Sequence, residues 1–301
     1  MSTDLFATVL DCNGRPLTLD QPRVVGIINV TPDSFSDGGQ FADLESAVAH
    51  GVRLAEEGAD MLDVGGESTR PGSADVSVEE ELRRVLPVIE QLIARTALPI
   101  AVDTSKPEVM RAAVAAGAGM INDVYALRRE GAMDAAADLR VPICLMHMQG
   151  EPRSMQDAPY YDDVVGEVHR FLTDRLFACE LAGIDRRKVM VDPGFGFGKD
   201  LEHNLALLRR LERFADLGSG VYAGLSRKSM IGTLTGRKDP AERAAGSVAA
   251  ALIAVQRGAR MVRVHDVAAT VDAVKVWHAV QSGDKPERRD TPQAPRWPDD
   301  E

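Results

Sequence analysis

The feature that most constrains this chain is a unit that recurs from residue 24 to residue 281, in which a short apolar segment precedes an amphipathic segment of helical period. The apolar segments are typical of buried parallel strands and lie near 24–29, 60–64, 98–102, 119–122, 141–146, 189–192, 221–225 and 261–264. The helical segments lie near 43–57, 77–95, 106–117, 130–139, 160–182, 201–214, 240–257 and 267–281. Eight such units predict an α/β fold, a single (β/α)8 TIM barrel, with a doubly wound sheet as the alternative.

The segments outside these units divide the chain into three parts. Residues 1–23 are an N-terminal segment in which we expect a hairpin that turns at Asn13-Gly14. Residues 24–283 are the expected barrel. Residues 284–301 are rich in proline and charge, which predicts a disordered tail.

Composition and charge exclude several classes of function. The 301 residues carry a formal net charge of -11, which argues against nucleic acid or an acidic membrane surface as a partner. No apolar run is long enough to span a bilayer, and the N-terminus lacks the pattern of a signal peptide. The 3 cysteines have neither CxxC spacing nor a disulfide pattern, so we expect a cytoplasmic protein.

Polar residues follow the apolar segments, where a barrel enzyme keeps its chemistry. The first apolar segment runs into 29–39, which is dense in turn residues and is expected to be a mobile loop. A plain surface turn is the alternative, but the same layout recurs down the chain, which a chance turn would not predict.

Three of these polar residues, Asp103, Asn122 and Asp192, carry carboxylate or amide groups. If they converge in a barrel mouth, they suit a flat ligand with several N–H donors and ring acceptors, such as an aminopyrimidinone. Two alternatives stay open. Each carboxylate caps the next helix, or the group binds a divalent metal, although the spacing is poor for a metal cluster.

A second group is cationic and comprises Arg70, Arg227, Lys228, Arg263 and His265. In an acidic protein such a group indicates an anionic substrate such as a phosphate ester, because arginine matches the geometry of two phosphate oxygens. The turn at 226–229 is expected to open a helix, whose free N–H groups favour an anion.

The glycine-rich loop at 194–199 lacks the spacing of nucleotide-binding loops. We interpret it as a tight loop that presents Phe197 as a stacking face. The alternative is a phenylalanine that packs the loop against the barrel.

Seven motifs, in chain order, resemble those of the dihydropteroate synthase family, and the resemblance covers about residues 24 to 281. They are NVTPDSFSDGG at 29–39, DVGGESTRPG at 63–72, VDT at 102–104, IND at 121–123, DPGFGFGK at 192–199, SRKS at 226–229 and RVH at 263–265. The first two motifs are long and specific, and none of the motif positions departs from the family pattern.

The resemblance implies the reaction of that family. (7,8-Dihydropterin-6-yl)methyl diphosphate condenses with p-aminobenzoate to give 7,8-dihydropteroate and pyrophosphate in folate biosynthesis. The implied enzyme is a transferase and a sulfonamide target that cleaves the C–O bond dissociatively, through a pterin methylene cation. Mg2+ is the implied cofactor, and a homodimer built on helices away from the loops, such as 241–256, is the implied assembly.

The resemblance also implies roles for single residues. The pterin site comprises Asp103, Asn122, Met146, Asp192, Phe197, Gly224 and Lys228. The p-aminobenzoate site comprises Phe35, Thr69, Arg70, Pro71 and Ser229. The pyrophosphate site comprises Asn29, Arg70, Arg263 and His265, and Asn29 is also the Mg2+ ligand. The residues at the reacting centre are Asp37, Arg263 and His265, and no general base is assigned.

Three other functions are weighed on the same fold. A pterin-dependent methyltransferase leaves the loop at 29–39 and the turn at 226–229 unexplained. A non-catalytic pterin-binding copy is expected to lose Phe35, Asp37 or Arg70, which are all present. A sugar-phosphate aldolase requires a Schiff-base lysine inside a strand, whereas Lys228 follows one.

Overall fold

The computed structural model describes residues 8–31, 39–68, 75–150, 155 and 158–283. Eight parallel strands close into a barrel in the order β10-β3-β4-β5-β6-β7-β8-β9. They are β3 (Arg23–Asn29), β4 (Met61–Gly65), β5 (Ile100–Asp103), β6 (Met120–Asp123), β7 (Ile143–Met146), β8 (Val189–Asp192), β9 (Val221–Ala223) and β10 (Ala259–Val264). The predicted TIM barrel is therefore confirmed, and the doubly wound alternative is wrong.

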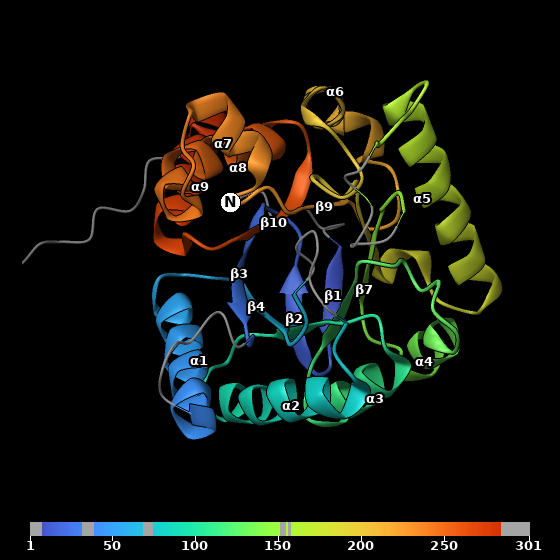
Figure 1. The fold of residues 1–301 in the computed structure, drawn as a ribbon, viewed down its shortest axis with the longest axis vertical. Coiled ribbons are helices and arrows are strands. Elements are labelled where there is room, and N and C mark those ends of the chain that lie inside the picture. Colours follow the sequence, from blue (N-terminus) through green and yellow to red (C-terminus); the bar gives the residue numbers. More distant parts are fainter. Residues whose placement is uncertain (1–7, 32–38, 69–74, 151–154, 156–157, 284–301) are drawn as a thin grey trace, which may run out of the picture.

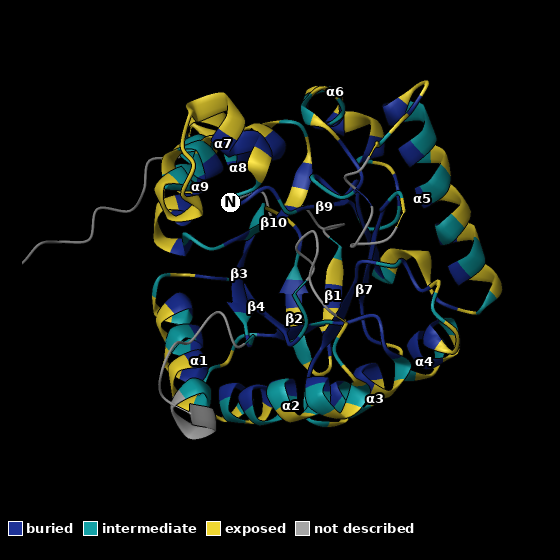
Figure 2. Cartoon of the chain, viewed as in Figure 1, coloured by how far each residue is buried: buried dark blue, intermediate teal, exposed yellow. Residues whose placement is uncertain are grey.

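Helices surround the strands, as Figure 1 shows. They are α1 (Gly39–Glu56), α2 (Val78–Arg95), α3 (Pro107–Ala115), α4 (Ala132–Leu139), α5 (Val164–Leu181), α6 (Leu201–Arg209), α7 (Ser229–Thr235), α8 (Ala244–Gln256) and α9 (Val267–Ser282). Their inner faces are buried against the strands and their outer faces are exposed (Figure 2). Among the described helices we find none with the length and apolar content to cross a bilayer.

Helix boundaries follow local signals where a capping residue is present. Ser77 caps α2 by accepting a hydrogen bond from the Glu80 backbone N–H at 3.2 Å, and acidic residues fill the first turn, where they favour the helix dipole. Two expected helices are interrupted, because short 3-10 turns at Leu211–Phe214 and Pro240–Arg243 replace part of each. The expected tail at 284–301 lies outside the described residues.

The expected N-terminal hairpin is present and closes one end of the barrel. Strands β1 (Val9–Cys12) and β2 (Arg15–Thr18) pair antiparallel. The turn residues Asn13 and Gly14 both have positive φ, at 56° and 80°, as a tight two-residue hairpin requires. The hairpin lies close to β6, because a Cβ atom on Gly119 would lie only 2.3 Å from the Cys12 carbonyl oxygen.

The barrel interior is apolar at the end that the hairpin covers. The hairpin buries Leu10, Cys12, Leu17 and Leu19 in one cluster with an interior residue from each barrel strand: Val25, Met61, Ala101, Met120, Cys144, Met190, Tyr222 and Met261. Side chains alternate along a strand, so the next interior positions lie two residues farther on. These positions are Ile27, Asp63, Asp103, Asn122, Met146, Asp192, Gly224 and Arg263. The interior therefore changes from apolar to largely polar toward the C-terminal ends of the strands.

The contribution of the hairpin to the stability of the closed barrel end can be tested by mutation. We expect Leu10→Ala to lower the free energy of unfolding by about 2–5 kcal/mol, because it leaves a cavity in a fully buried cluster. Val9→Ala is the matched control on the same strand, since Val9 is 55% exposed, and should change stability by less than about 0.5 kcal/mol. Urea denaturation measures both. An equal loss of unfolding free energy in the two variants would contradict the view that the hairpin stabilises this end of the barrel.

Candidate active site

The centre of the polar layer is the guanidinium of Arg263, which spans three strands. Its Nε donates to Asp63 Oδ2 at 2.5 Å, and its Nη2 donates to Asp103 Oδ2 at 2.9 Å. Arg263 is on β10, Asp63 on β4 and Asp103 on β5, so these pairs form only across a closed barrel. The sequence therefore correctly grouped Arg263 and Asp103 at strand ends.

Asp63 stands at a strand end and opens the motif at 63–72, but we assigned it no role from the sequence. It is fully buried, and its Oδ2 accepts hydrogen bonds from Asn122 Nδ2 at 3.0 Å and from the Tyr222 hydroxyl at 3.4 Å, besides that from Arg263. One carboxylate oxygen therefore orients both Arg263 and Asn122. The signal that would have found it is its position, two residues after an interior methionine on β4.

Burial and the neighbouring charges shift the pKa values of Asp103 and Arg263. Burial raises the pKa of Asp103 from its ordinary 3.8 to about 7, although the Arg263 guanidinium opposes the rise. Burial acts to lower the pKa of Arg263, but the Asp63 and Asp103 carboxylates outweigh it, so this pKa is raised. Arg263 is therefore a permanent cation, whereas Asp103 titrates near neutrality.

Asp192 and Lys228 form the second half of the site. Burial raises the pKa of Asp192 while the Lys228 ammonium opposes the rise. Burial lowers the pKa of Lys228 to about 8, against the opposing effect of Asp192. Asp192 Oδ1 also accepts from the Gly194 backbone N–H at 2.7 Å, which fixes the start of the glycine-rich loop. This carboxylate therefore serves the loop as well as the cation.

The two phenylalanines of the glycine-rich loop have different roles. Phe195 is fully buried in the core, so it is the residue that packs the loop. Phe197 is only partly buried, and the Lys228 Nζ lies 4.3 Å from its ring centroid. Phe197 also packs against the cluster that contains Met146. The interpretation of Phe197 as a presented face agrees with this arrangement.

The remaining predicted pterin residue, Gly224, lies beside the carboxylate of Asp192. A Cβ atom there would lie 3.7 Å from Asp192 Oδ2. A side chain at this position would therefore reach toward the polar layer. The structure thus brings together all seven residues that the resemblance implied for the pterin.

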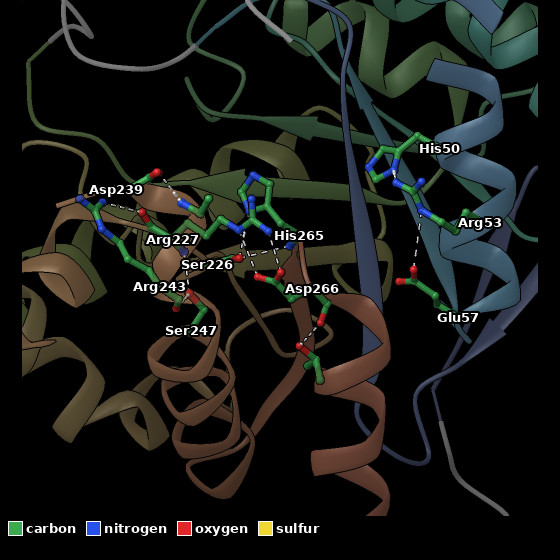
Figure 3. A network of polar contacts seen from close by, with 12 residues as sticks. His50, Arg53, Glu57, Ser226, Arg227, Asp239, Arg243, Ser247, His265 and Asp266 are labelled. Atoms are coloured by element: carbon green, nitrogen blue, oxygen red, sulfur yellow. Dashed lines mark hydrogen bonds and ion pairs between the residues drawn. The ribbon is translucent and has the colours of Figure 1, made fainter. Parts of the chain in front are cut away.

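Ser226 and His265 lie side by side at the ends of β9 and β10 (Figure 3). Ser226 Oγ lies 2.9 Å from His265 Nδ1 and also accepts from the His265 backbone N–H at 3.2 Å. Arg227 differs from our expectation of an anion-binding cation. Its guanidinium donates to both carboxylate oxygens of Asp266, at 2.6 and 3.1 Å, and so ties the turn to α9 (Figure 3).

Asn29 ends β3 at the level of Gly65 and Asp103, because Asn29 pairs in register with Gly65 and Gly65 with Asp103. The next residue, Val30, donates its backbone N–H to the Gly65 carbonyl at 2.8 Å. The chain that follows β3 therefore begins directly beside the chain that follows β4. Of the implied residues in these loops, Phe35, Asp37, Thr69, Arg70 and Pro71 lie outside the described part of the chain.

A buried ion cluster contacts Gly66 and Glu67, which follow β4, and no local sequence pattern predicts it. Lys106 Nζ donates to Glu67 Oε2 at 2.6 Å and also contacts Glu81 Oε2, and both Lys106 and Glu81 are buried. Arg84 donates to the Gly66 carbonyl at 2.8 Å. These partners are 18 to 39 residues apart in sequence, so local patterns do not reveal them.

Comparison with known proteins agrees with this geometry. A model described as "Pterin binding enzyme" matches residues 25–265. Dihydropteroate synthase of Escherichia coli is 52% identical over 93% of this chain and 99% of its own length. The chain belongs to the dihydropteroate synthase family. The structure of Xanthomonas albilineans dihydropteroate synthase with 4-aminobenzoic acid has 68% identity and a TM-score of 0.88, covering 92% of this chain and 99% of that one.

Two further solved structures carry informative ligands. Dihydropteroate synthase from Xanthomonas albilineans in complex with 7,8-dihydropteroate is 66% identical, with a TM-score of 0.84, over 91% of this chain and 99% of that one. Yersinia pestis dihydropteroate synthase in a sulfonamide drug complex is 48% identical, with a TM-score of 0.87, over the same shares of the two chains. Family membership thus holds at high identity and nearly full length.

The aldolase alternative fails in this dihydropteroate synthase-family chain. None of the eight described barrel strands contains a lysine, which removes the strand lysine that an aldolase needs. Within the described ranges there is also no group of three or more His, Cys, Asp or Glu side chains arranged to hold a metal ion. The carboxylates of the polar layer are instead hydrogen-bonded to Arg263, Asn122 and the loop.

Proposed function

We propose that this chain condenses (7,8-dihydropterin-6-yl)methyl diphosphate with p-aminobenzoate and releases 7,8-dihydropteroate and pyrophosphate. The observation that carries the proposal is the polar layer at the C-terminal ends of the strands, in a chain 66% identical to a synthase solved with 7,8-dihydropteroate. Asp103, Asn122 and Asp192 supply hydrogen-bonding groups from β5, β6 and β8 of the barrel wall. A flat heterocycle with both donors and acceptors satisfies them together.

We infer that the pterin ring lies between the polar layer and the face made by Met146 and Phe197. Asp103 and Asp192 accept from ring N–H groups, and Asn122 both donates and accepts. Lys228, held 4.3 Å from the Phe197 ring, donates to a ring acceptor. Arg263 is already oriented by two carboxylates, so it presents its guanidinium plane without reorganisation when the substrate binds.

The chemistry follows from where charge develops. The methylene C–O bond breaks, its electron pair leaves with the pyrophosphate, and the electron-rich dihydropterin carries the positive charge. Arg263 and His265 stabilise the departing anion. The neutral aniline nitrogen of p-aminobenzoate then bonds to the methylene carbon and loses a proton, so no strong base is required. Ser229, the first residue of α7, lies next to Lys228 and so can position the second substrate.

Asn29 fits the role of Mg2+ ligand. Mg2+ takes few oxygens from a protein and completes its octahedron with substrate phosphates and water, so one amide oxygen at a strand end suits it better than a carboxylate cluster. When bound, the ion would supply charge neutralisation for the pyrophosphate. The three cysteines are buried free thiols, which supports the proposed cytoplasmic location.

We also propose a homodimer through α7, α8 and α9, which lie together on one side of the barrel (Figure 1). These helices expose large apolar side chains, namely Leu234 at 54%, Ile253 at 41%, Val276 at 66% and Val280 at 74%. A second copy of the chain would cover them, away from the loops at the mouth.

The function is tested by pyrophosphate release from the pterin diphosphate with Mg2+. We expect release to require p-aminobenzoate and to match dihydropteroate formation. Arg263→Ala should lower the rate by at least about 100-fold, because it removes a charge that stabilises the leaving group. Arg260→Ala is the matched control, since Arg260 is an exposed residue of the same strand that donates to the Leu19 carbonyl. Tight pterin binding without turnover would instead indicate a non-catalytic copy.

The pH profile tests the roles of Asp103 and Lys228. The pKa of Asp103 is raised to about 7, so kcat/KM for the pterin substrate should fall below that pH as the carboxylate gains a proton. The pKa of Lys228 is lowered to about 8, so kcat/KM should fall above that pH as the ammonium loses its proton. Lys228→Arg keeps the charge and should remove only the alkaline fall. An alkaline fall that persists in Lys228→Arg would exclude Lys228 as its source.

Sedimentation tests the dimer. We expect wild type to sediment as a dimer and Val276→Asp to dissociate it, because a charge would be buried without a partner in the interface. Phe177→Asp is the control, since Phe177 is 60% exposed but lies on α5. A wild type that stays monomeric at micromolar concentration would refute the dimer.

A further inference from the structure

Lys199 is a buried lysine that no step of the proposed reaction uses. Only 2% of the residue is exposed, and it follows the glycine-rich loop directly. Its Nζ lies 2.9 Å from each of three acceptors, which are His147 Nδ1, the Gly194 carbonyl and the Phe197 carbonyl. An ammonium group has three N–H donors, so these three contacts can use all of them, and the His147 carbonyl lies farther from Nζ, at 3.4 Å.

The hydrogen-bond acceptors around Lys199, and not its burial, support the ammonium form. Burial lowers the pKa of Lys199 well below its ordinary value and so favours the neutral amine, while the Asp192 carboxylate favours the ammonium. Burial, together with the nearby Lys199 charge, lowers the pKa of His147 to about 2, so the imidazole is neutral at physiological pH. A neutral imidazole has one ring nitrogen free to accept a hydrogen bond, and here that nitrogen is Nδ1. His147 itself is fixed by Phe171, whose ring meets it edge-on at 4.8 Å.

Lys199 and Lys228 contact different atoms of the loop. Lys199 Nζ donates to the Gly194 and Phe197 carbonyls, whereas Lys228 Nζ donates to the Phe195 carbonyl and lies over the Phe197 ring. Asn204 adds a third restraint by accepting from the Gly196 backbone N–H at 2.7 Å. Of these three side chains, only Lys199 donates hydrogen bonds to the backbone carbonyls of both Gly194 and Phe197.

The loop needs such restraints because of its composition. Gly194, Gly196 and Gly198 all have positive φ, at 73°, 77° and 61°. Three glycines in five residues leave the unrestrained loop with large conformational entropy. Larger residues are excluded, since a Cβ atom on Gly194 would lie 1.9 Å from the His147 carbonyl oxygen. The order of the loop must therefore come from contacts with its backbone.

A buried cation is a costly way to supply those contacts. The effective penalty of burying one ion is several kcal/mol, and an apolar side chain of similar volume would avoid it. An apolar side chain, however, cannot bond two carbonyls of the loop and an imidazole of the neighbouring strand end at once. A lysine at this position is therefore explained by its effect on the position of the loop, and not by its effect on stability alone.

We propose that Lys199 is a positioning residue that holds the loop at 194–198, so that Phe197 and Lys228 meet the pterin in one fixed arrangement. This inference rests on the proposed function of the site. Lys199 acts through the loop backbone and does not touch the substrate. Its loss should therefore affect the pterin and leave p-aminobenzoate binding nearly unchanged.

The test compares Lys199→Met with Lys188→Met in the full-length chain. Lys188 is the matched control, because its Nζ also donates to a backbone carbonyl, that of Arg140 at 2.7 Å, but before β8 rather than at its C-terminal end. Fluorescence titration with an oxidised pterin measures the Kd without turnover. We expect Lys199→Met to raise the pterin Kd and KM by about 10- to 100-fold, as displaced binding groups do. The KM for p-aminobenzoate at saturating pterin should change less than about twofold.

Each outcome separates the two claims. If wild type binds the pterin and Lys199→Met binds it equally well, the positioning role is wrong and the proposed function stands. If wild type does not bind the pterin, the proposed function is wrong. A uniform rise of both KM values with a lower Tm would reduce Lys199 to a purely structural residue.

A second variant covers the case in which Lys199→Met does not fold. His147→Phe keeps an aromatic ring beside Phe171 but removes the ring nitrogen that accepts from Lys199. We expect the same selective rise of the pterin Kd, at about 3- to 10-fold, because two of the three contacts remain. A folded His147→Phe with wild-type pterin affinity would overturn the inference.

Discussion

A guanidinium held between two carboxylates joins the closure of this barrel to its chemistry. Arg263 comes from the last strand, and its partners Asp63 and Asp103 come from the second and third strands of the barrel in chain order. They meet because β10 pairs with β3 and closes the sheet. Loss of one partner would leave a buried charge uncompensated, which costs about 3–5 kcal/mol. The interaction that orients the anion-binding cation therefore also depends on a complete barrel.

The two ends of the barrel interior divide stability from function. At the N-terminal end, one apolar residue from each strand packs with the hairpin, and nothing there requires chemistry. Two residues farther along the strands, the interior side chains are mostly carboxylates, an amide and a guanidinium. Buried polar groups are costly unless they are hydrogen-bonded, and here Asp63 Oδ2 accepts from Arg263, Asn122 and Tyr222, whereas Asp63 Oδ1 has no hydrogen-bond partner among the described residues. The apolar end thus supports a polar end that would not be stable alone.

Sequence reasoning found those features that local pattern encodes. Strand and helix periods gave all eight units, and position after an apolar run identified Asp103, Asn122, Asp192 and Arg263. Pairing is different, because it depends on which distant residues the fold brings together. The salt bridge of Arg227 to Asp266 crosses 39 residues, and the bond of Lys199 to His147 crosses 52. In the sequence, a buried lysine is also indistinguishable from a surface lysine, because its hydrogen-bond acceptors come from distant residues.

Charge balance explains how an acidic protein can bind an anionic substrate. Among the described residues of the polar layer and its supporting loop, three carboxylates face three cations, namely Asp63, Asp103, Asp192, Lys199, Lys228 and Arg263. Burial pushes Asp103, Lys228 and Lys199 toward their neutral forms, so none of these three holds its charge as firmly as an exposed group does. Arg263 does, because its two carboxylate neighbours raise its pKa. The permanent positive charge thus lies where a leaving anion needs it, while the groups around the ring remain able to donate or accept.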